Sequence, residues 1–402
     1  MKKRVIIVGA GAAGMLAAGF AAKQHEVFLV ERNEKPGRKL MITGKGRCNV
    51  TNNCMPDEFL RHVPVNSRFL YGALSRFAPV DTMTLMEKLG VPLKTERGRR
   101  VFPISDKAAD VVDALKKFSA PAQFCVGRVK KLLFQDGAVK GVVLEDGREI
   151  SADAVILSTG GTSYPTTGST GDGYDFARQA GHTIVSPKAS LVPIVTTEEW
   201  PSKVMGLSLR NVKLTVHKKK REVFSELGEM LFTHFGVSGP LVLSASSYLR
   251  DPKGSVLSID LKPALSFQKL DARLQREFAA GSTQALSNIM RSLLPRKLIP
   301  ICLFAAGVDG TKQGAQATKE DRKALIEVLK DLALHVHGFR PVEEAIITSG
   351  GVNVKEVDPK TMESKRVHGL YFAGEILDVD AHTGGYNLQI AFATGFAASH
   401  AI

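Results

Sequence analysis

The chain has 402 residues and a formal net charge of +14 at pH 7, with 44% apolar and 23% charged residues. This composition is ordinary for a globular protein, so it excludes a disordered chain, and the length predicts two or three domains. No apolar stretch beyond the N-terminus approaches the length of a membrane span, and the four cysteines form neither a C-x-x-C pair nor a metal-ligand spacing. We therefore expect a cytoplasmic protein with reduced thiols, no membrane span and no metal site.

The N-terminal segment predicts a strand, a turn, a helix and a second strand. Residues 5–8 and 27–30 are short apolar runs, and between them lies a G-x-G-x-x-G motif formed by Gly9, Gly11 and Gly14. In order, these glycines permit a tight turn, the close approach of a pyrophosphate, and close packing of the helix on the strand. Glu31, after the second run, can accept hydrogen bonds from ribose hydroxyls. A signal peptide or a short membrane span would also have a basic start and an apolar run, but neither explains the glycine spacing.

A basic, glycine-rich segment, RNEKPGRKLMITGKGRCNVTN, follows Glu31. Its charge comes from Arg38, Lys39, Lys45 and Arg47, and Gly44 and Gly46 permit close backbone approach. Alone it would be a solvated loop. After a nucleotide-binding unit, it is predicted to form part of the cofactor site.

Helices are predicted at residues 81–89 and 107–118. Residues 123–157 form alternating runs separated by two D-G turns, which predicts a β-meander whose last run, 154–157, is another parallel strand. That strand would meet the ligand at its carboxyl end, at Thr159, Gly160 and Gly161. A loop with glycines at 168, 171 and 173 could cradle an anion before a helix at 174–180.

The chain changes character at residue 191. Alternating Val212, Leu214 and Val216 predict a strand that leads to a hairpin tip formed by Lys218, Lys219, Lys220 and Arg221. Helical patterns follow at 267–294 and at 319–335, where Leu325, Ile326, Leu329 and Leu332 form one apolar stripe. Strand and turn patterns return with 345–348 and 370–373. Gly384 and Gly385 then open a helix whose N-terminus, at 386–389, would present backbone N–H groups to a ligand.

These distant pieces favour FAD over a nicotinamide cofactor alone. An extended flavin dinucleotide needs a phosphate site at the start of the chain, a second strand-end loop, and a late helix N-terminus near its ring. Reduced flavin develops negative charge, which a helix dipole stabilises.

The blocks GKGRCNVTN, STGGTSYPTTGSTGDGY, GEMLFTHFGVSGP and LYFAGEILDVDAHTGGYNLQIAFATG resemble the signature blocks of the BaiN/YhiN-type NAD(P)/FAD-dependent oxidoreductase family. The resemblance covers essentially the whole chain. It implies an α/β fold: a Rossmann-like FAD-binding domain, with a central parallel sheet plus a β-meander, built from both chain ends and interrupted by an inserted domain of strands and helices. The FAD-binding domain is expected at 1–190 and 346–402. The insertion is expected at 191–345, β-rich to about 262 and helical from about 263.

Carried onto this sequence, the resemblance implies FAD contacts at Gly9, Gly11, Ala12, Ala13, Gly14, Glu31, Arg32, Arg38, Lys39, Thr43, Gly44, Arg47, Asn49, the backbone of Val129, Gly374, Glu375, Asp378, Gly385, Tyr386, Asn387, Leu388 and Gln389. No catalytic acid or base follows from the sequence. The candidates for facing the flavin ring are Cys48, Tyr164, His234 and His382.

We expect an FAD-dependent oxidoreductase that reduces an unsaturated or carbonyl-containing small molecule, with NAD(P)H as the donor. The sequence has no second G-x-G-x-x-G motif, so a nicotinamide cofactor would bind without a Rossmann unit of its own. A flavoprotein that binds or modifies RNA and a non-catalytic flavin-binding protein remain alternatives. The net charge of +14 and the basic cluster at 218–221 motivate the RNA alternative. A solvated hairpin tip is the favoured interpretation of the cluster, because no aromatic residues are interleaved with it.

Overall fold

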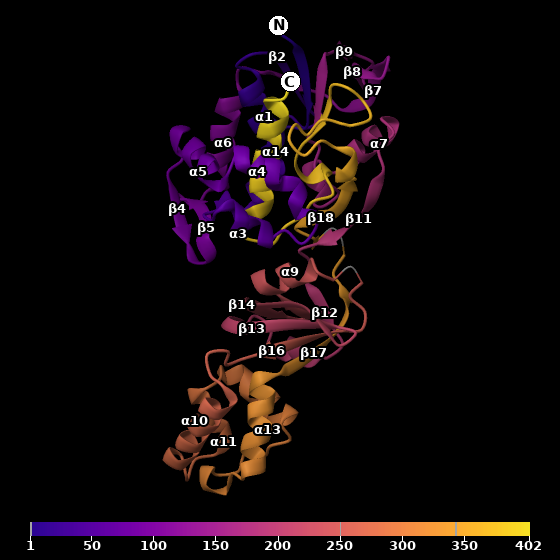
Figure 1. Cartoon of the computed structure of the whole chain (residues 1–402). Coiled ribbons are helices and arrows are strands. Elements are labelled where there is room, and N and C mark those ends of the chain that lie inside the picture. The colour runs from indigo at the N-terminus through magenta and orange to yellow at the C-terminus, as the bar shows by residue number, and fades with distance from the viewer. Residues whose placement is uncertain (1, 250, 342–343) are drawn as a thin grey trace. The chain divides into compact units, whose positions relative to one another are not determined.

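The structure is a computed structural model and describes residues 2–249, 251–341 and 344–402. The chain forms two compact units, one of Met1–Ser190 with Pro341–Ile402 and one of Leu191–Arg340. Each unit has its own buried apolar core. In Figure 1 the indigo and yellow ends of the chain share the first unit, so the C-terminal segment completes the fold that begins at the N-terminus.

The first unit is built on a five-stranded parallel sheet in the order β19-β10-β1-β2-β6. The strands are β1 (Arg4–Val8), β2 (Glu26–Glu31), β6 (Gln123–Val126), β10 (Ala154–Leu157) and β19 (Leu370–Phe372). Every residue of β10 is buried, as expected of a parallel strand with both faces covered. Val155 of β10 pairs with Leu370 of β19, which joins the two chain ends. The predicted Rossmann-like fold is confirmed.

The first unit contains the helices α1 (Ala12–Ala21), α2 (Arg38–Ile42), α3 (Pro56–Arg61), α4 (Tyr71–Arg76), α5 (Pro79–Lys88), α6 (Ala108–Ser119), α7 (Asp172–Gln179) and α14 (Tyr386–Ser399). α1 and α14 pack closely because small residues meet, and a Cβ at Gly395 would lie 2.6 Å from the Ala13 carbonyl oxygen. Further along both helices, the rings of Phe20 and His400 lie 5.1 Å apart. α1 and α14 therefore run side by side in the same direction (Figure 1).

Three smaller antiparallel sheets complete the first unit: β3 (Thr51–Asn52) with β5 (Arg100–Pro103) and β4 (Leu93–Glu96), β7 (Val129–Gln135) with β8 (Ala138–Leu144) and β9 (Glu149–Ser151), and β11 (Ile184–Ser190) with β18 (Ile347–Val352). The predicted meander is therefore shorter than residues 123–157. Its first run is divided at Gly127, because Phe124 and Cys125 pair with Leu29 and Val30 in the parallel sheet.

The second unit contains a closed six-stranded barrel in the order β12-β15-β14-β13-β16-β17. Its strands are β12 (Ile194–Thr196), β13 (Ser208–Lys218), β14 (Arg221–Thr233), β15 (Gly236–Ser238), β16 (Ser255–Asp260) and β17 (Leu332–Phe339). Its helices are α8 (Trp200–Lys203), α9 (Pro240–Ser246), α10 (Phe267–Ala280), α11 (Leu286–Ile289), α12 (Ile299–Ala305) and α13 (Lys319–Lys330). Within this unit, α10, α11 and α13 lie beyond one side of the barrel (Figure 1). The predicted hairpin tip is confirmed, with Lys219 and Lys220 at positive φ between β13 and β14.

Two predictions of regular structure were wrong in this part of the chain. The helix predicted at 319–335 ends at Lys330, and Leu332 lies on β17, so the helical part of the insertion does not extend to residue 345. The segment LALHVHGF alternates with a period of two, and Leu332, Leu334 and Val336 point into the barrel core. The helical pattern at 267–294 is also broken, since α10 ends at Ala280.

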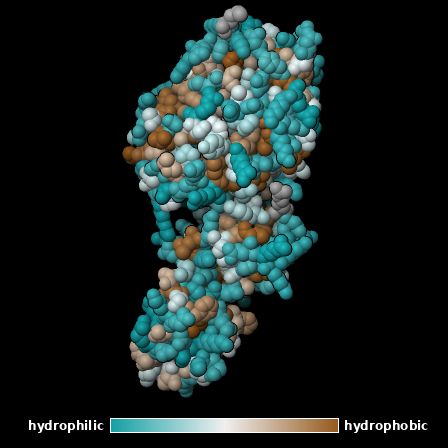
Figure 2. Space-filling view, viewed as in Figure 1, coloured by the Kyte–Doolittle hydropathy of each residue, from teal (hydrophilic) through white to brown (hydrophobic). Residues whose placement is uncertain are grey.

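The strand predicted at 345–348 begins at Ile347 and continues through Gly350 and Gly351 to Val352. Hydrophilic residues cover most of the visible face of each unit in Figure 2. Within the described ranges, every helix is too short or too polar to cross a lipid bilayer.

Candidate functional site

The glycine motif forms a tight turn between β1 and α1. Gly9 has φ +100°, and its N–H donates to the Val30 carbonyl at 2.8 Å. A Cβ at Gly14 would lie 1.9 Å from the Gly9 carbonyl oxygen, so α1 approaches β1 as only glycine allows. A Cβ at Gly11, the N-cap of α1, would meet no atom within 4 Å. The N-terminus of α1, followed by the buried Ala12 and Ala13, therefore faces open space.

Glu31, the last residue of β2, is hydrogen-bonded to the turn between β1 and α1. Its carboxylate accepts hydrogen bonds from the Ala10 N–H at 2.8 Å and from the Asn33 N–H at 2.9 Å. The side chain of Asn33 also donates to Glu31 and accepts from Arg38. Glu31 is thus held at the carboxyl edge of the sheet, with Arg38 positioned through Asn33.

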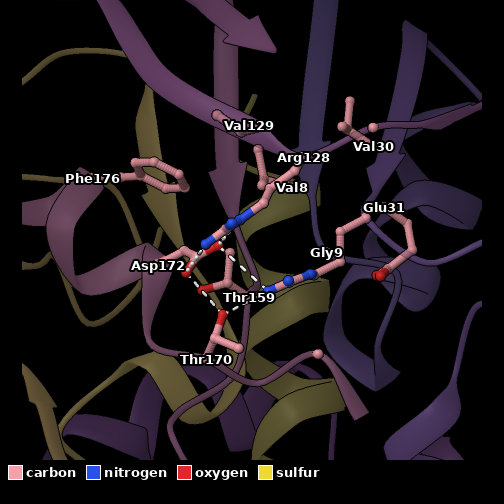
Figure 3. Close-up of a pocket in the computed structure, with 13 residues that line it drawn as sticks. Val8, Gly9, Val30, Glu31, Arg128, Val129, Thr159, Thr170, Asp172 and Phe176 are labelled. Atoms are coloured by element: carbon pink, nitrogen blue, oxygen red, sulfur yellow. Dashed lines mark hydrogen bonds and ion pairs between the residues drawn. The ribbon is translucent and has the colours of Figure 1, made fainter. Parts of the chain in front are cut away.

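A pocket lies at this edge (Figure 3). Its walls are Val8, Gly9, Val30, Glu31, Arg32, Gly127, Arg128, Val129, Thr159, Gly168, Thr170, Asp172 and Phe176. The Thr159 hydroxyl is buried and has no hydrogen-bond partner within the described part of the chain. Since buried hydroxyls are normally paired, this atom supports a bound polar ligand.

Charged side chains from three segments meet on one side of the pocket. Arg128 donates to both carboxylate oxygens of Asp172, at 2.8 and 3.0 Å, and Arg32 donates to the Thr170 hydroxyl at 2.7 Å. Figure 3 shows Arg128, Thr170 and Asp172 converging. The hydrogen bonds from Arg128 hold the pKa of Asp172 below its ordinary value, so this carboxylate is ionised at neutral pH.

A second polar cluster connects segments far apart in the sequence. The Lys39 ammonium lies 2.6 Å from a Glu375 carboxylate oxygen and donates to Ser163 at 2.6 Å. Glu375 also accepts from Ser163 and from the Thr348 N–H, at 2.9 Å each. The predicted contacts Lys39 and Glu375 are therefore brought together, and each is already paired with protein.

Glycines allow these segments to approach one another. Gly160 has φ +75°, and a Cβ at Gly161 would lie 2.4 Å from the Thr348 hydroxyl. Gly374, at φ +79°, is the point where the last segment meets α1, because a Cβ there would lie 3.1 Å from the Ala13 Cβ.

The N-terminus of α14 forms a separate feature. Gly385 is its N-cap, at φ +97°, and a Cβ there would lie 2.3 Å from the Thr51 backbone. Asn387 holds the preceding turn, accepting from the Ala381 N–H and donating to the Ala381 and His382 carbonyls. Leu388 is half-buried. As in any α-helix, the first N–H groups have no partner inside the helix, and they give this end partial positive charge.

Four residues predicted to contact FAD have side chains that form hydrogen bonds or ring contacts within the protein itself. Gln389 is fully buried and bonds Thr51, Thr82 and the Phe77 carbonyl. Tyr386 is buried and stacks on His62, with ring centroids 4.7 Å apart. Asp378 accepts from Asn66, and Asn49, with its amide nitrogen facing the Thr51 and Val101 carbonyls, accepts from the Gly385 N–H at 3.0 Å. The Gln389 amide is therefore oriented by three protein hydrogen bonds, and a contact between Gln389 and FAD stays a prediction.

The basic loop after α2 is only partly open. Gly44 and Lys45 are exposed, and the Thr43 hydroxyl donates to the Leu40 carbonyl at 2.7 Å. Arg47 pairs with Glu96 and Asp106, and its guanidinium lies 4.2 Å from the centroid of the Phe102 ring. This arginine thus lies in a surface ion-pair cluster.

Comparison with known proteins identifies the family. Residues 3–401 match the family model described as the HI0933-like protein Rossmann domain. The chain belongs to the HI0933-like family. This agrees with the oxidoreductase, flavoprotein and inserted-domain character expected from the sequence.

Curated relatives of this HI0933-like protein align over almost their whole length. It is 32% identical to the ribosomal RNA dihydrouridine synthase of Escherichia coli, over 98% of this chain and 96% of the relative. It is 33% identical to the enzyme of the same name from Haemophilus influenzae, over 99% and 98%. It is 30% identical to the 3-dehydro-bile acid delta(4,6)-reductase of Clostridium scindens, also over 99% and 98%.

Solved structures share the fold at lower identity. A quinol-fumarate reductase chain matches with a TM-score of 0.53 at 18% identity, over 100% of this chain and 70% of that chain. A Mycobacterium smegmatis Sdh1 chain matches with a TM-score of 0.51 at 17% identity, over 100% and 68%. At these identities the likeness establishes the fold alone.

The four catalytic candidates have different surroundings in this HI0933-like protein. Cys48 is fully buried, and burial raises the pKa of its thiol to about 12. His382 is also buried, and burial lowers the pKa of its imidazole to about 4, so it is neutral at pH 7. Tyr164 is half-buried at φ +52°, and burial raises the pKa of its hydroxyl. His234 is exposed and belongs to the second unit.

Sequence reasoning missed part of the pocket wall. Arg128, Thr170, Asp172 and Phe176 line the pocket but were not among the predicted contacts. The loop carrying glycines 168, 171 and 173 was predicted to cradle an anion, yet it places an ionised carboxylate there. A signal did exist for one of these residues, because Arg128 directly precedes Val129, whose backbone was predicted to contact FAD.

Proposed function

We propose that the protein is an FAD-dependent reductase of a carbon–carbon double bond conjugated to a carbonyl group. The names of the relatives carry this proposal. Dihydrouridine is a uracil ring whose double bond beside a carbonyl has been saturated, and a delta(4,6)-reductase of a 3-dehydro-bile acid acts on double bonds conjugated to a ketone. Both names therefore describe double bonds that are conjugated to a carbonyl group and are reduced.

The geometry of the first unit supports an extended FAD. The pocket beside Glu31 and Thr159 would hold the adenosine, and the open N-terminus of α1 at Gly11 would hold the pyrophosphate. Ala13 lies beside Gly395, ten residues beyond the N-cap of α14. At 1.5 Å per residue, α14 therefore begins roughly 12 Å further along than α1. Two helix N-termini separated in this way fit the pyrophosphate and the ring of one molecule.

FAD, when bound, would accept hydride from NAD(P)H and transfer it to the double bond. The chain would supply a helix N-terminus that stabilises negative charge. Reduction of the double bond also needs a proton. Of the candidates in the first unit, Tyr164 carries a proton at neutral pH and is partly accessible, whereas His382 is neutral and Cys48 is sealed. Tyr164→Phe is therefore the first variant to test for loss of turnover with flavin reduction retained.

Two substrate classes fit the proposed chemistry. RNA is favoured by the basic charge, which is concentrated in the second unit: residues 191–340 contain 22 Lys and Arg against 14 Asp and Glu, a net charge of +8. Phosphate-rich ligands are attracted by such an excess. A small-molecule enone is the second candidate, favoured by the 30% identity to the bile-acid reductase.

An anaerobic two-step experiment tests the proposal. The FAD-loaded protein is first mixed with NADH or NADPH, and bleaching of the flavin band identifies the donor. The reduced protein is then mixed with a 3-oxo-4-ene steroid or with uridine-containing ribosomal RNA. Reoxidation of the flavin together with a product that has gained two hydrogens supports the proposal. If dithionite-reduced protein is reoxidised by neither substrate, the proposed reaction is wrong.

A further inference from the structure

An amphipathic segment in the helical part of the second unit exposes two cations and, about two helical turns further along the chain, an aromatic ring. A 3-10 helix, Arg296–Leu298, runs directly into α12. Leu298, Ile299, Cys302 and Leu303 are buried in the core of the unit. At the spacing of the opposite helix face, the exposed residues are Arg296, Lys297, Pro300 and Phe304. We call these four residues the basic stripe.

Phe304 is unusually open to solvent. Its relative exposure is 89%, whereas the next large apolar side chain of this unit, Leu227, is 59% exposed. Burying a phenylalanine side chain is worth roughly 1.5–3 kcal/mol, so the fold gains nothing by leaving this ring in water. An exposed aromatic ring beside cations is instead a common feature of surfaces that bind single-stranded nucleic acid, where bases stack on the ring.

The sequence on either side of the basic stripe contains no acidic residue for a long stretch. Between Glu277 and Asp309 there is no acidic residue, while Arg291, Arg296 and Lys297 are all exposed. Among the ion pairs of residues 2–249, 251–341 and 344–402, none involves these three cations. Within the described residues these three cations are therefore exposed and form no ion pair.

The hairpin tip between β13 and β14 differs on each of these points. Lys218 bonds the Asp251 carboxylate at 3.2 Å and the backbone carbonyls of Asp251 and Lys253. Glu222 directly follows the basic cluster. Part of its charge is thus compensated, and the cluster lacks interleaved aromatic residues.

We propose that the basic stripe binds RNA at an unpaired segment, with Arg296 and Lys297 contacting phosphates and Phe304 stacking on a base. Unpaired bases are required because, in a duplex, both faces of each base are covered by the stacked neighbouring base pairs. This inference rests on the RNA version of the proposed function. It goes further by assigning RNA contact to the helical part of the insertion, away from the hairpin tip.

Four variants of the FAD-loaded full chain, one single and three double, test the assignment. The stripe variants are Arg296→Glu with Lys297→Glu, and Phe304→Ala. The matched control is Lys319→Glu with Lys323→Glu, which makes the same charge change at exposed positions of α13. The competing surface is tested by Lys219→Glu with Lys220→Glu. The probe is a fluorescein-labelled single-stranded 20-nucleotide oligouridylate, followed by anisotropy at several salt concentrations.

The charge variant should bind at least about 10-fold more weakly, and the slope of log affinity against log salt should flatten by roughly 1.4, because each phosphate contact on single strands contributes about 0.7. Phe304→Ala should weaken binding about 5- to 100-fold with an unchanged slope, since stacking is not a charge effect. The α13 control should bind nearly as the natural chain does.

Other results would overturn the assignment. Equal losses in the stripe and α13 variants would mean that only net charge matters, and a loss confined to the hairpin variant would place the RNA there. Absence of RNA binding by the natural chain would reject the stripe, whereas turnover of the steroid enone by the same preparation would leave the proposed reduction standing.

Discussion

Substitution by alanine should have different effects at two glycines of the same motif, impairing cofactor binding alone at Gly11 and the fold at Gly14. Gly11→Ala adds a methyl group where no atom lies within 4 Å, while Gly14→Ala adds one 1.9 Å from the Gly9 carbonyl oxygen. If the N-terminus of α1 binds a pyrophosphate, Gly11→Ala should impair cofactor binding without impairing the fold. Gly14→Ala should impair the fold itself.

The magnitudes follow from the local geometry. Gly11 has φ −83°, which alanine adopts without strain, so lower entropy of the unfolded chain gains about 0.4–1 kcal/mol. Losing glycine at an N-cap costs a similar amount, so the melting temperature of the apoprotein should move by no more than about 3 °C. Losing two hydrogen bonds to a charged group at about 1.5 kcal/mol each would weaken FAD binding by roughly 3 kcal/mol, or about 150-fold. Gly14→Ala should cost about 3 kcal/mol or more, because the clash is with backbone.

Thermal unfolding of the apoprotein by circular dichroism and titration with FAD, followed by flavin fluorescence, separate the two effects. Gly11→Ala should keep its melting temperature and lose affinity, and Gly14→Ala should lose both. Unchanged FAD affinity in Gly11→Ala would refute the placement of the pyrophosphate at α1. A large fall in its melting temperature would show instead that the added methyl group at Gly11 meets other atoms of the protein in solution.

Three further changes test groups that the structure connects. Glu375→Gln removes the carboxylate that lies 2.6 Å from Lys39, and the free energy of unfolding in urea should fall by about 1–3 kcal/mol. Gln389→Leu leaves three buried partners without their hydrogen bonds, and the same measurement should fall by about 3 kcal/mol or more; an unchanged value would show that these bonds do not stabilise the fold. Asp380→Asn tests a pH effect, because burial raises the pKa of Asp380 from its ordinary value of 3.8 to about 6. The folded state therefore holds this proton more tightly than the unfolded state, and stability is lost as pH rises from about 4 through 6. The variant stays neutral, so it should gain up to about 3 kcal/mol relative to the natural chain between pH 4 and pH 8, and an equal effect at both pH values would contradict the assignment.

The sequence was most informative where the constraint is local. Gly9, Gly11 and Gly14 are tied to one turn, and the apolar runs before and after them fit buried strands of a covered sheet. Only part of the pocket wall could be predicted in this way. Arg32, Arg128 and Asp172 come from three separate segments, and nothing in their spacing brings them together.

Periodicity failed in two distinct ways. At Leu332 the spacing to Leu325 and Leu329 fits a helix, but the alternation that begins there fits a strand, and barrel closure decides the outcome. In α14 nearly every side is buried, so the sequence gives no polar face that would show which way Gln389 points. The N–H groups at the start of that helix could be predicted, whereas the direction of its side chains required the packing.

The two substrate classes of the relatives can be separated by charge more readily than by the glycine motif. Both classes require the same hydride chemistry, so the dinucleotide-binding parts of the first unit cannot distinguish them. The first unit carries a net charge of +6, with 32 basic and 26 acidic residues, whereas the smaller second unit carries +8. A steroid has no row of phosphates to reward such an excess, but an RNA has one at every nucleotide. The salt dependence of substrate binding, measured on the intact chain, is therefore the property in which an RNA reductase and an enone reductase of this fold should differ most.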